Sequence, residues 1–163
     1  MEIVFDSSTL ILLAKTEVLR VVSGDIQIII PKMVRTECAR KDTFDAKLIS
    51  ILIDNRNIEV VTANKEAVAA LCRDFRIHIG ETESLSVALK RKLPLAVDDL
   101  PTIKVCKILN IQYTTAIHFL INITEKEKID RETAIVKLEK LSLYGRYNKR
   151  IIDNAAKRLK GGK

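Results

Sequence analysis

Carboxylates directly follow two short apolar runs of this sequence, and that placement is typical of a metal site. Residues 2–5 lead into Asp6, and residues 95–97 lead into Asp98 and Asp99. In an open parallel sheet, groups at the carboxyl ends of the strands share one crevice. Several carboxylates in one crevice repel each other unless a cation lies between them. We therefore expect a divalent metal with oxygen ligands, and metal-assisted chemistry on a phosphodiester.

Further acids lie between these two points, each near the start of an expected helix. Glu37 is one helical turn from the apolar Val34, although, taken alone, a solvated pair with Lys41 explains it better. Glu81 and Glu83 are about 200° apart on a helix, so only one of them can face a shared site fully. The apolar positions Leu85, Ala88 and Leu89 lie on the stripe that begins at Glu81. We therefore favour Glu81 as a ligand and keep Glu83 as an auxiliary candidate.

Helix capping is the alternative interpretation of the acids at the strand ends. Asp6 precedes Ser7 and Ser8 at a turn, where either the acid or the serines can cap the helix that follows. Asp98 and Asp99 precede a helix that starts near Pro101, and capping explains one of them but not both. Each acid alone is weak support for a metal site, and the argument depends on all of them meeting.

Short apolar runs alternate with helical patterns along the first three quarters of the chain. This alternation predicts a three-layer α/β fold with a mostly parallel sheet and helices on both faces. Gly80 is expected to break the chain before a helix, and Ser23-Gly24-Asp25 to form a turn. The expected strands are 2–5, 26–30, 58–61, 93–97 and 111–113, and the expected helices are 9–15, 17–22, 31–38, 43–53, 64–75, 81–92, 101–109, 115–123, 131–143 and 147–160.

Composition fits a single basic domain. The chain has 163 residues, of which 47% are hydrophobic but only 4% aromatic, so the core must consist of Ile, Leu, Val and Ala. The net charge is +7, and residues 146–163 hold seven of the basic side chains against Asp153 alone. This charge favours a polyanionic partner. We expect a core at residues 1–125 and a helical extension with a basic tail at 126–163 in the same domain, ending in disordered residues 161–163.

Other classes of chemistry find little support in the residues. The sequence has no GxGxxG or P-loop motif and no Ser-His-Asp set, and His78 and His118 are expected to be structural. Cys38, Cys72 and Cys106 lack metal-site spacing and are expected to be reduced core residues. The chain opens without a basic signal region, and no apolar run reaches the about 18 residues of a membrane span. We expect a cytoplasmic protein.

Four stretches together resemble the PIN-domain ribonucleases, and in particular the VapC-like toxins of type II toxin–antitoxin pairs. Residues 4–11 resemble the opening strand, acid and Ser/Thr turn of that family, and residues 30–37 resemble its second-acid segment. Residues 80–88 resemble a Gly-Glu-x-Glu variant of the third segment, and residues 95–99 resemble the fourth, with Asp99 as the best match for its acid. The resemblance covers roughly residues 2–125.

The resemblance implies a site and a substrate. Its metal-binding and catalytic quartet would be Asp6, Glu37, Glu81 and Asp99, with Glu83 and Asp98 as auxiliary candidates. These acids would bind Mg²⁺ or Mn²⁺ and cleave single-stranded RNA, with the Lys15, Arg35 and Lys104 side chains as candidates to hold its backbone. Ser8 and Thr9 would orient Asp6 or its bound water.

Partners follow from the same resemblance. We expect a homodimer and a small antitoxin protein, because the helices after residue 115 and the N-terminal helices are expected to expose more aliphatic surface than a monomer of this size needs. The aliphatic residues meant are Leu10, Leu12, Leu13, Val18, Leu19 and Val21. Two other interpretations stay open: a PIN-fold nuclease of RNA processing or DNA repair, and a non-catalytic RNA-binding module, against which the full acidic quartet argues. A receiver domain also has acids at its strand ends, but it needs an acceptor Asp after a middle strand, and residues 58–61 lead into Thr62-Ala63-Asn64 without an acid.

Overall fold

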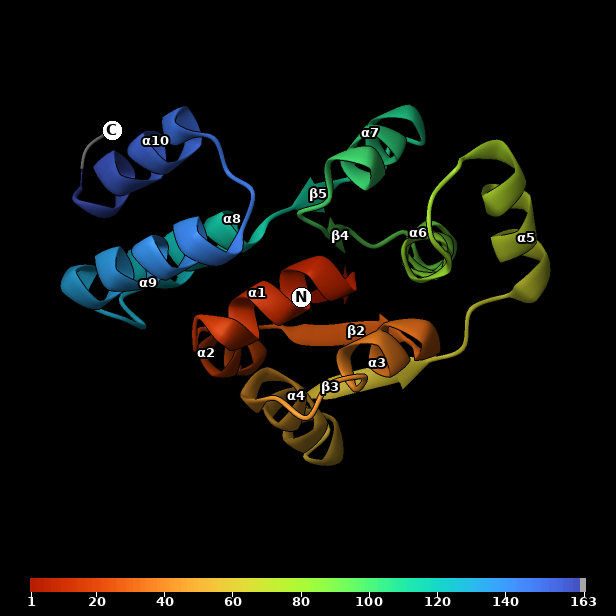
Figure 1. Ribbon diagram of the computed structural model, residues 1–163, viewed down its shortest axis with the longest axis horizontal. Helices are drawn as coiled ribbons and strands as arrows, with labels where there is room; N and C mark the ends of the chain where they lie inside the picture. The colour runs from red at the N-terminus through yellow and green to blue at the C-terminus, as the bar shows by residue number, and fades with distance from the viewer. Residues whose placement is uncertain (162–163) are drawn as a thin grey trace.

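A five-stranded parallel sheet forms the centre of the computed structural model, which describes residues 1–161 (Figure 1). The strand order is β3-β2-β1-β4-β5, and every neighbouring pair is parallel. This confirms the predicted three-layer α/β fold. The expected disorder at residues 162–163 lies outside the described residues, and Gly161 is described in a turn. The strands are β1 (Glu2–Phe5), β2 (Gln27–Pro31), β3 (Ile58–Val61), β4 (Leu95–Ala96) and β5 (Tyr113–Thr114).

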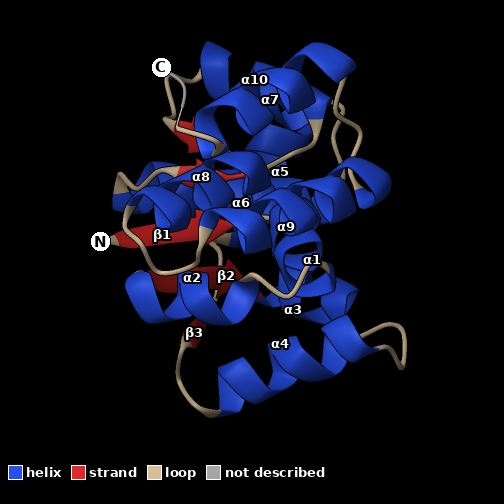
Figure 2. Cartoon of the chain, turned by 90° about the vertical axis from the view of Figure 1, so that its left-hand side faces the viewer, coloured by secondary structure: helices blue, strands red, loops and turns tan. Residues whose placement is uncertain are grey.

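Ten helices cover the two faces of the sheet (Figures 1 and 2). Helices α5 (Lys65–Asp74), α6 (Ile79–Arg91) and α7 (Leu100–Ile108) pack on one face, and the remaining helices build the layer on the other. That second layer comprises α1 (Ser7–Lys15), α2 (Leu19–Asp25), α3 (Lys32–Cys38), α4 (Phe44–Asp54), α8 (Ala116–Glu125), α9 (Arg131–Tyr144) and α10 (Lys149–Leu159).

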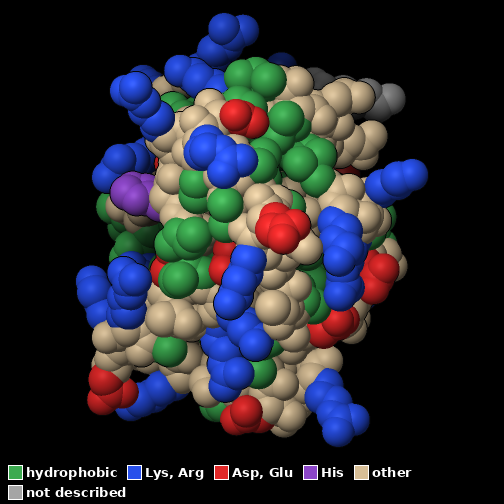
Figure 3. All heavy atoms as spheres, turned by 90° about the vertical axis from the view of Figure 1, so that its right-hand side faces the viewer, with side chains coloured by type: hydrophobic (Ala, Val, Ile, Leu, Met, Phe, Trp, Pro, Cys, Tyr) green, Lys and Arg blue, Asp and Glu red, His purple; other side chains and the backbone are tan. Residues whose placement is uncertain are grey.

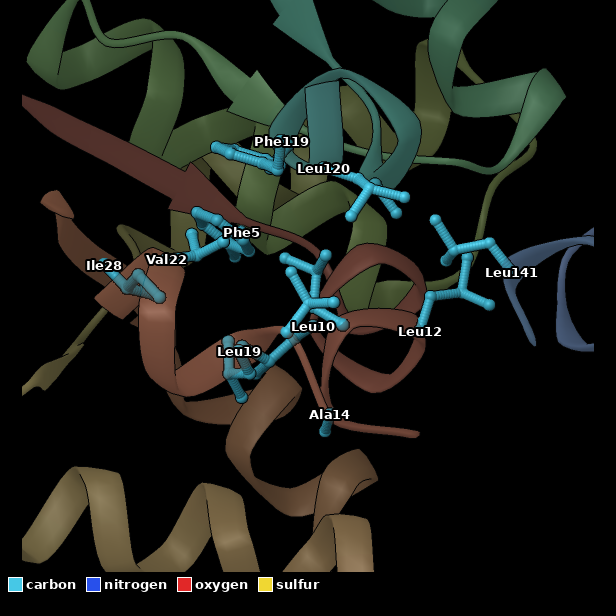
Figure 4. Close-up of a cluster of buried hydrophobic side chains, with 14 of the residues drawn as sticks. Phe5, Leu10, Leu12, Ala14, Leu19, Val22, Ile28, Phe119, Leu120 and Leu141 are labelled. Atoms are coloured by element: carbon cyan, nitrogen blue, oxygen red, sulfur yellow. The ribbon is translucent and has the colours of Figure 1, made fainter. Parts of the chain in front are cut away.

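Strands β1 to β4 each contribute side chains to two separate cores, because successive side chains point to opposite faces of the sheet. Val4 and Ile29 belong to the core under α5–α7, whereas Phe5 and Ile28 belong to the larger core under the other helices. Figure 4 shows that larger core, where the rings of Phe5 and Phe119 stack with centroids 5.1 Å apart. Burial on both faces explains why the strands read as continuous apolar runs rather than as alternating ones.

The connections reverse direction between β1 and β4, which are neighbours in the sheet. The chain leaves β1 for α1 on one face and leaves β4 for α7 on the other. In open α/β sheets, the crevice at such a switch point is where ligands bind. Asp6 follows β1, and Asp98 and Asp99 follow β4 at this point. A receiver domain has the order 2-1-3-4-5, so the observed order excludes that interpretation.

Several element boundaries differ from the sequence prediction. Gly80 lies inside the first turn of α6 and does not precede it, because α6 packs closely on α3 at this point. The predicted turn at residues 23–25 is the last turn of α2. The side chain that caps α1 is Asp6, and neither Ser7 nor Ser8 takes that role. Strand β5 begins two residues later than predicted.

The expected excess of exposed aliphatic surface on the N-terminal helices is wrong. Leu10, Leu13 and Leu19 are fully buried, because α1 and α2 pack beneath α8, and α9 also covers α1. Leu12 and Val18 are buried as well, and only Val21 is half-exposed. After residue 115, α9 and α10 do expose apolar side chains, as expected. The exposed large apolar residues of the helices are Phe44, Ile51, Ile79, Leu89, Leu100, Ile108, Val136, Leu143, Tyr144 and Ile151.

Cysteine placement partly follows the prediction. Cys38 and Cys106 are buried, and burial raises the pKa of their thiols to about 12 and about 11. Cys72 is only partly buried, with its sulfur 3.5 Å from Oγ1 of Thr82. Within residues 1–161, no helix combines the length and apolarity needed to cross a lipid bilayer.

Candidate metal centre

Asp6 is the most deeply buried acid of the crevice, with 1% of its surface exposed. Its amide donates to Ala96 O at 2.9 Å, which extends the β1–β4 ladder and places Asp6 beside the end of β4. Its Oδ2 accepts from the Ser8 hydroxyl at 2.9 Å and from the Ser8 amide at 3.4 Å. Its Oδ1 is buried without a hydrogen-bond partner among the described residues. Such an atom is costly, and a bound cation would satisfy it.

The charge state of Asp6 reflects this burial. Loss of water, together with the negative charge of Glu81, raises the pKa of its carboxyl to about 6, against the hydrogen bonds from Ser8. The carboxylate is therefore ionised at neutral pH only at a cost in free energy.

Glu37 reaches the site from α3 and packs on the backbone of Gly80 in α6. A Cβ placed on Gly80 would lie 2.6 Å from Oε2 of Glu37 and 2.7 Å from its Cδ, closer than real side chains approach. Only glycine leaves room for the carboxylate in this position. Gly80, which the sequence predicts to break a helix, thus forms a cradle, that is, a space in which the Glu37 carboxylate lies.

Replacing Gly80 by alanine tests this cradle. Alanine favours the helix by about 1 kcal/mol over glycine, but here its methyl group displaces the Glu37 carboxylate. We expect Gly80→Ala to bind Mn²⁺ at least about tenfold more weakly in a calorimetric titration. The matched control is Gly24→Ala in α2, where an added Cβ meets no described atom within 4 Å. Equal Mn²⁺ affinity in both variants would contradict the role of the cradle.

Glu81 lies at the start of α6 and is partly buried. Its Oε2 accepts from the backbone amide of His78 at 2.7 Å, which caps the helix. Burial raises the pKa of Glu81, and the negative charges of Asp99 and Glu37 act in the same direction. The apolar stripe that favoured Glu81 is only partly found, because Leu85 and Ala88 are buried but Leu89 is 39% exposed. Helix α6 is enclosed by α3, α5 and the sheet, so one stripe does not describe it.

Glu83 has a different role in the described contacts. Its Oε2 accepts from the amide of Met33 at 3.0 Å and so caps the first turn of α3, the helix that carries Glu37. It fixes α3 against α6, and the acids of the crevice are not among its recorded partners.

The two glutamates should therefore differ when each is changed to glutamine. Glu81→Gln is expected to lower RNA cleavage at least about tenfold, because a charge facing the crevice is lost. Glu83→Gln keeps a carbonyl oxygen for Met33, so we expect a loss of stability within about 1 kcal/mol and cleavage within a few-fold of wild type. Cleavage rates and thermal unfolding of both variants check this order, and the reverse order would contradict it.

Asp99 begins α7 and repeats the pattern of Asp6 and Glu81. Its Oδ2 accepts from the Thr102 amide at 2.9 Å and from the Thr102 hydroxyl at 2.7 Å. Within residues 1–161, each of these three acids gives one oxygen to a helix N-terminus and has no recorded hydrogen bond at the other. Helix N-termini stabilise negative charge. Capping and ligand binding are therefore compatible for the same side chain.

Asp98 has both oxygens occupied by protein donors. Oδ2 accepts from the Thr9 hydroxyl at 2.6 Å and the Ala116 amide at 3.0 Å, and Oδ1 accepts from the Tyr147 hydroxyl. Thr9 thus contacts Asp98 and not Asp6. Nothing in the sequence near residue 98 indicates Tyr147, because it lies 49 residues away in a link between two helices.

The structure brings Asp6, Glu37, Glu81 and Asp99 into one electrostatic environment. Glu81 raises the pKa of Asp6, and Asp99 and Glu37 raise that of Glu81. In the described part of the chain, no three His, Cys, Asp or Glu side chains already form a group that could hold a metal ion. On the face that Figure 3 presents, acidic side chains are visible between hydrophobic and basic ones.

A doubly wound parallel sheet with carboxylates at its switch point defines an α/β protein with a candidate ligand site at that point. A family model described as DUF3368, a PIN domain, matches residues 2–160, and the chain belongs to this PIN-domain family. The match extends beyond residue 125 and includes α9 and α10. Comparison with curated proteins finds no match. PIN domains generally use divalent metal ions, and the oxygen-rich donor set with the unpartnered Asp6 Oδ1 fits such an ion.

Proposed function

We propose that this protein is an endoribonuclease that cleaves single-stranded RNA and depends on Mg²⁺ or Mn²⁺. Asp6, Glu37, Glu81 and Asp99 would hold the metal. The observation that carries this proposal is the buried, unpartnered Oδ1 of Asp6 at the switch point of the sheet. It is supported by the charge effects of Glu81 on Asp6 and of Asp99 and Glu37 on Glu81. A site that only bound RNA would gain nothing from carboxylates facing phosphates, which disfavours a non-catalytic RNA-binding module.

The protein groups of the site prepare it for hydrolysis. A bound divalent ion supplies an activated water and neutralises charge on the attacked phosphate. Ser8 holds the carboxylate of Asp6 through Oδ2, and Oδ1 has no hydrogen-bond partner among the described residues. The N-termini of α1, α6 and α7 stabilise the acids in their ionised form. The exposed Arg35 and Lys104 side chains, on α3 and α7, would hold the RNA backbone. Lys15 is a weaker candidate, since its Nζ lies 5.5 Å from the centre of the Tyr144 ring at the far end of α1.

Metal removal tests the proposed chemistry directly. We expect purified protein to cleave single-stranded RNA with Mn²⁺ or Mg²⁺, to lose this activity in excess EDTA and to regain it when metal is restored. The Asp6→Asn protein, purified in parallel, shows whether a contaminating ribonuclease is responsible. Undiminished cleavage in EDTA would rule out the mechanism. Cleavage of structured RNA or DNA in preference to single-stranded RNA would favour the alternative of a processing or repair nuclease.

The biological role proposed for this nuclease is that of a cytoplasmic toxin held inactive by a small antitoxin, with a homodimer as the active form. The exposed Phe44, Ile51, Val136 and Leu143 side chains support this role, since such groups suit a protein interface. Light scattering of the purified protein measures its molar mass and so tests whether it is a dimer. Growth of cells that express the wild type or Asp6→Asn tests whether the protein is a toxin.

A further inference from the structure

The link between α9 and α10 contacts the acid-lined crevice through one side chain. The hydroxyl of Tyr147 donates to Oδ1 of Asp98, the residue next to Asp99. The ring of Tyr147 is packed against Gly145, where an added Cβ would lie 2.8 Å from Cδ2 of the tyrosine. Glycine at this point therefore lets the tyrosine turn back toward the sheet. The conformation of the link places the Tyr147 hydroxyl beside Asp98. Through this contact the extension after residue 125 reaches the site.

Hydrogen bonds at the side chain and at the backbone amide of Asp98 link Tyr147 to the most buried acid, Asp6. The backbone amide of Asp98 donates to Oγ of Ser8 at 3.1 Å, and Oγ of Ser8 donates to Oδ2 of Asp6 at 2.9 Å. A serine hydroxyl has one proton and rotates to suit its partners. Because the Ser8 oxygen accepts from Asp98, its proton is directed toward Asp6. The Asp6 carboxylate is then held by Oδ2, and Oδ1 stays available.

We propose that Tyr147 is a positioning residue of the metal centre. Its hydroxyl holds the side chain of Asp98. Asp98 in turn orients the Ser8 hydroxyl toward Asp6 and positions Asp99 at the start of α7. This inference rests on the proposed function, since it assumes that these acids bind metal. It assigns the C-terminal extension a part in building the site, and it assigns Asp98 to the support of the ligands.

Removal of one hydroxyl tests the proposal. The full chain carrying Tyr147→Phe keeps the ring in place and removes only the donor to Asp98. We expect its dissociation constant for Mn²⁺, measured by calorimetry without RNA, to rise about tenfold. The Mn²⁺ concentration for half-maximal cleavage should rise in parallel, while KM for RNA at saturating metal stays within about twofold. The matched control is Tyr144→Phe, three residues earlier, whose exposed hydroxyl has no recorded partner among residues 1–161.

Ser8→Ala provides the second variant, because it breaks the same chain one step nearer the metal. It should weaken Mn²⁺ binding at least as much as Tyr147→Phe does. The two changes together should weaken it no more than Ser8→Ala alone, as expected for residues acting through one path. If Tyr147→Phe does not fold, Ser8→Ala decides: an unchanged Mn²⁺ affinity there overturns the proposal.

The outcomes separate this inference from the proposed function. If the wild type neither binds Mn²⁺ nor cleaves RNA, both the proposed function and this inference are wrong. If the wild type does both and Tyr147→Phe melts at a lower temperature with unchanged Mn²⁺ affinity, the tyrosine only anchors α10. That result overturns the positioning role and leaves the nuclease intact.

Discussion

The Asp6→Asn protein should lose RNA cleavage and unfold less readily than the wild type at pH 7 without metal. The loss of activity is expected to be at least about 100-fold, because an amide is a poor substitute for the carboxylate whose unpartnered oxygen faces the site. Asparagine caps helices about as well as aspartate, so α1 keeps its N-terminal hydrogen bond. A loss of activity together with a gain in stability is the result that we expect when an acid of an active site is replaced.

The gain in stability should depend on pH with a definite sign. The pKa of Asp6 rises from 3.8 to about 6 in the folded protein, mainly through burial. The favourable contribution of the Asp6 carboxyl to the free energy of unfolding is complete below about pH 4. It is lost as the pH rises through about 6. A shift of this size corresponds to about 3 kcal/mol. The difference in unfolding free energy between Asp6→Asn and wild type should therefore grow by up to about 3 kcal/mol from pH 4 to pH 7.

Urea unfolding at several pH values, in EDTA, measures this difference. The control is Asp54→Asn on α4, an exposed acid whose change should affect neither cleavage nor the pH profile. Addition of Mn²⁺ should stabilise the wild type and not Asp6→Asn, because only the wild type binds it tightly. Wild-type cleavage by Asp6→Asn would show that the site is assigned wrongly. A pH-independent difference in stability would contradict the account of its burial.

Asp98→Ala is expected to give the largest loss of stability of any single change at the crevice. Three donors lose their acceptor at once: the Tyr147 hydroxyl, the Thr9 hydroxyl and the Ala116 amide. Buried donors left unpaired cost about 1–3 kcal/mol each, and part of that cost is recovered by relaxation and by water. We expect a total loss of about 3 kcal/mol. Hydrogen exchange should rise first in α9 and α10, because Tyr147 ties their link to the sheet.

Urea unfolding of Asp98→Ala beside Asp153→Ala measures this loss. Asp153 is an exposed acid on α10. Its replacement should change stability by no more than about 0.5 kcal/mol. If Asp98→Ala were as stable as that control, the hydrogen bonds to Asp98 would contribute little to the fold. The support that it gives to Ser8 would then be in doubt as well.

Local sequence determined the elements of this fold because each depends on residues close together in the chain. The apolar run 58–61 was predicted as a strand and is found as Ile58–Val61, and Asn64 begins a helix by capping it. Alternation of such runs with helices predicts a parallel sheet without knowledge of any contact. The same rule places Asp6 and Asp98-Asp99 at strand ends, so the sequence alone could name the acids of the candidate site.

Only the tertiary structure decided what each acid does, because its partners come from distant segments. Glu83 caps α3, Asp98 accepts from Tyr147, and Gly80 makes room for Glu37, each across many residues of chain. The N-terminal leucines looked exposed in sequence because the helices that bury them, α8 and α9, begin only at Ala116 and Arg131. Hydrophobic spacing shows which side of a helix is apolar, but packing decides what covers it. The sequence thus determined which groups reach the crevice, and the packing of α3, α6 and the C-terminal link decided how they are held there.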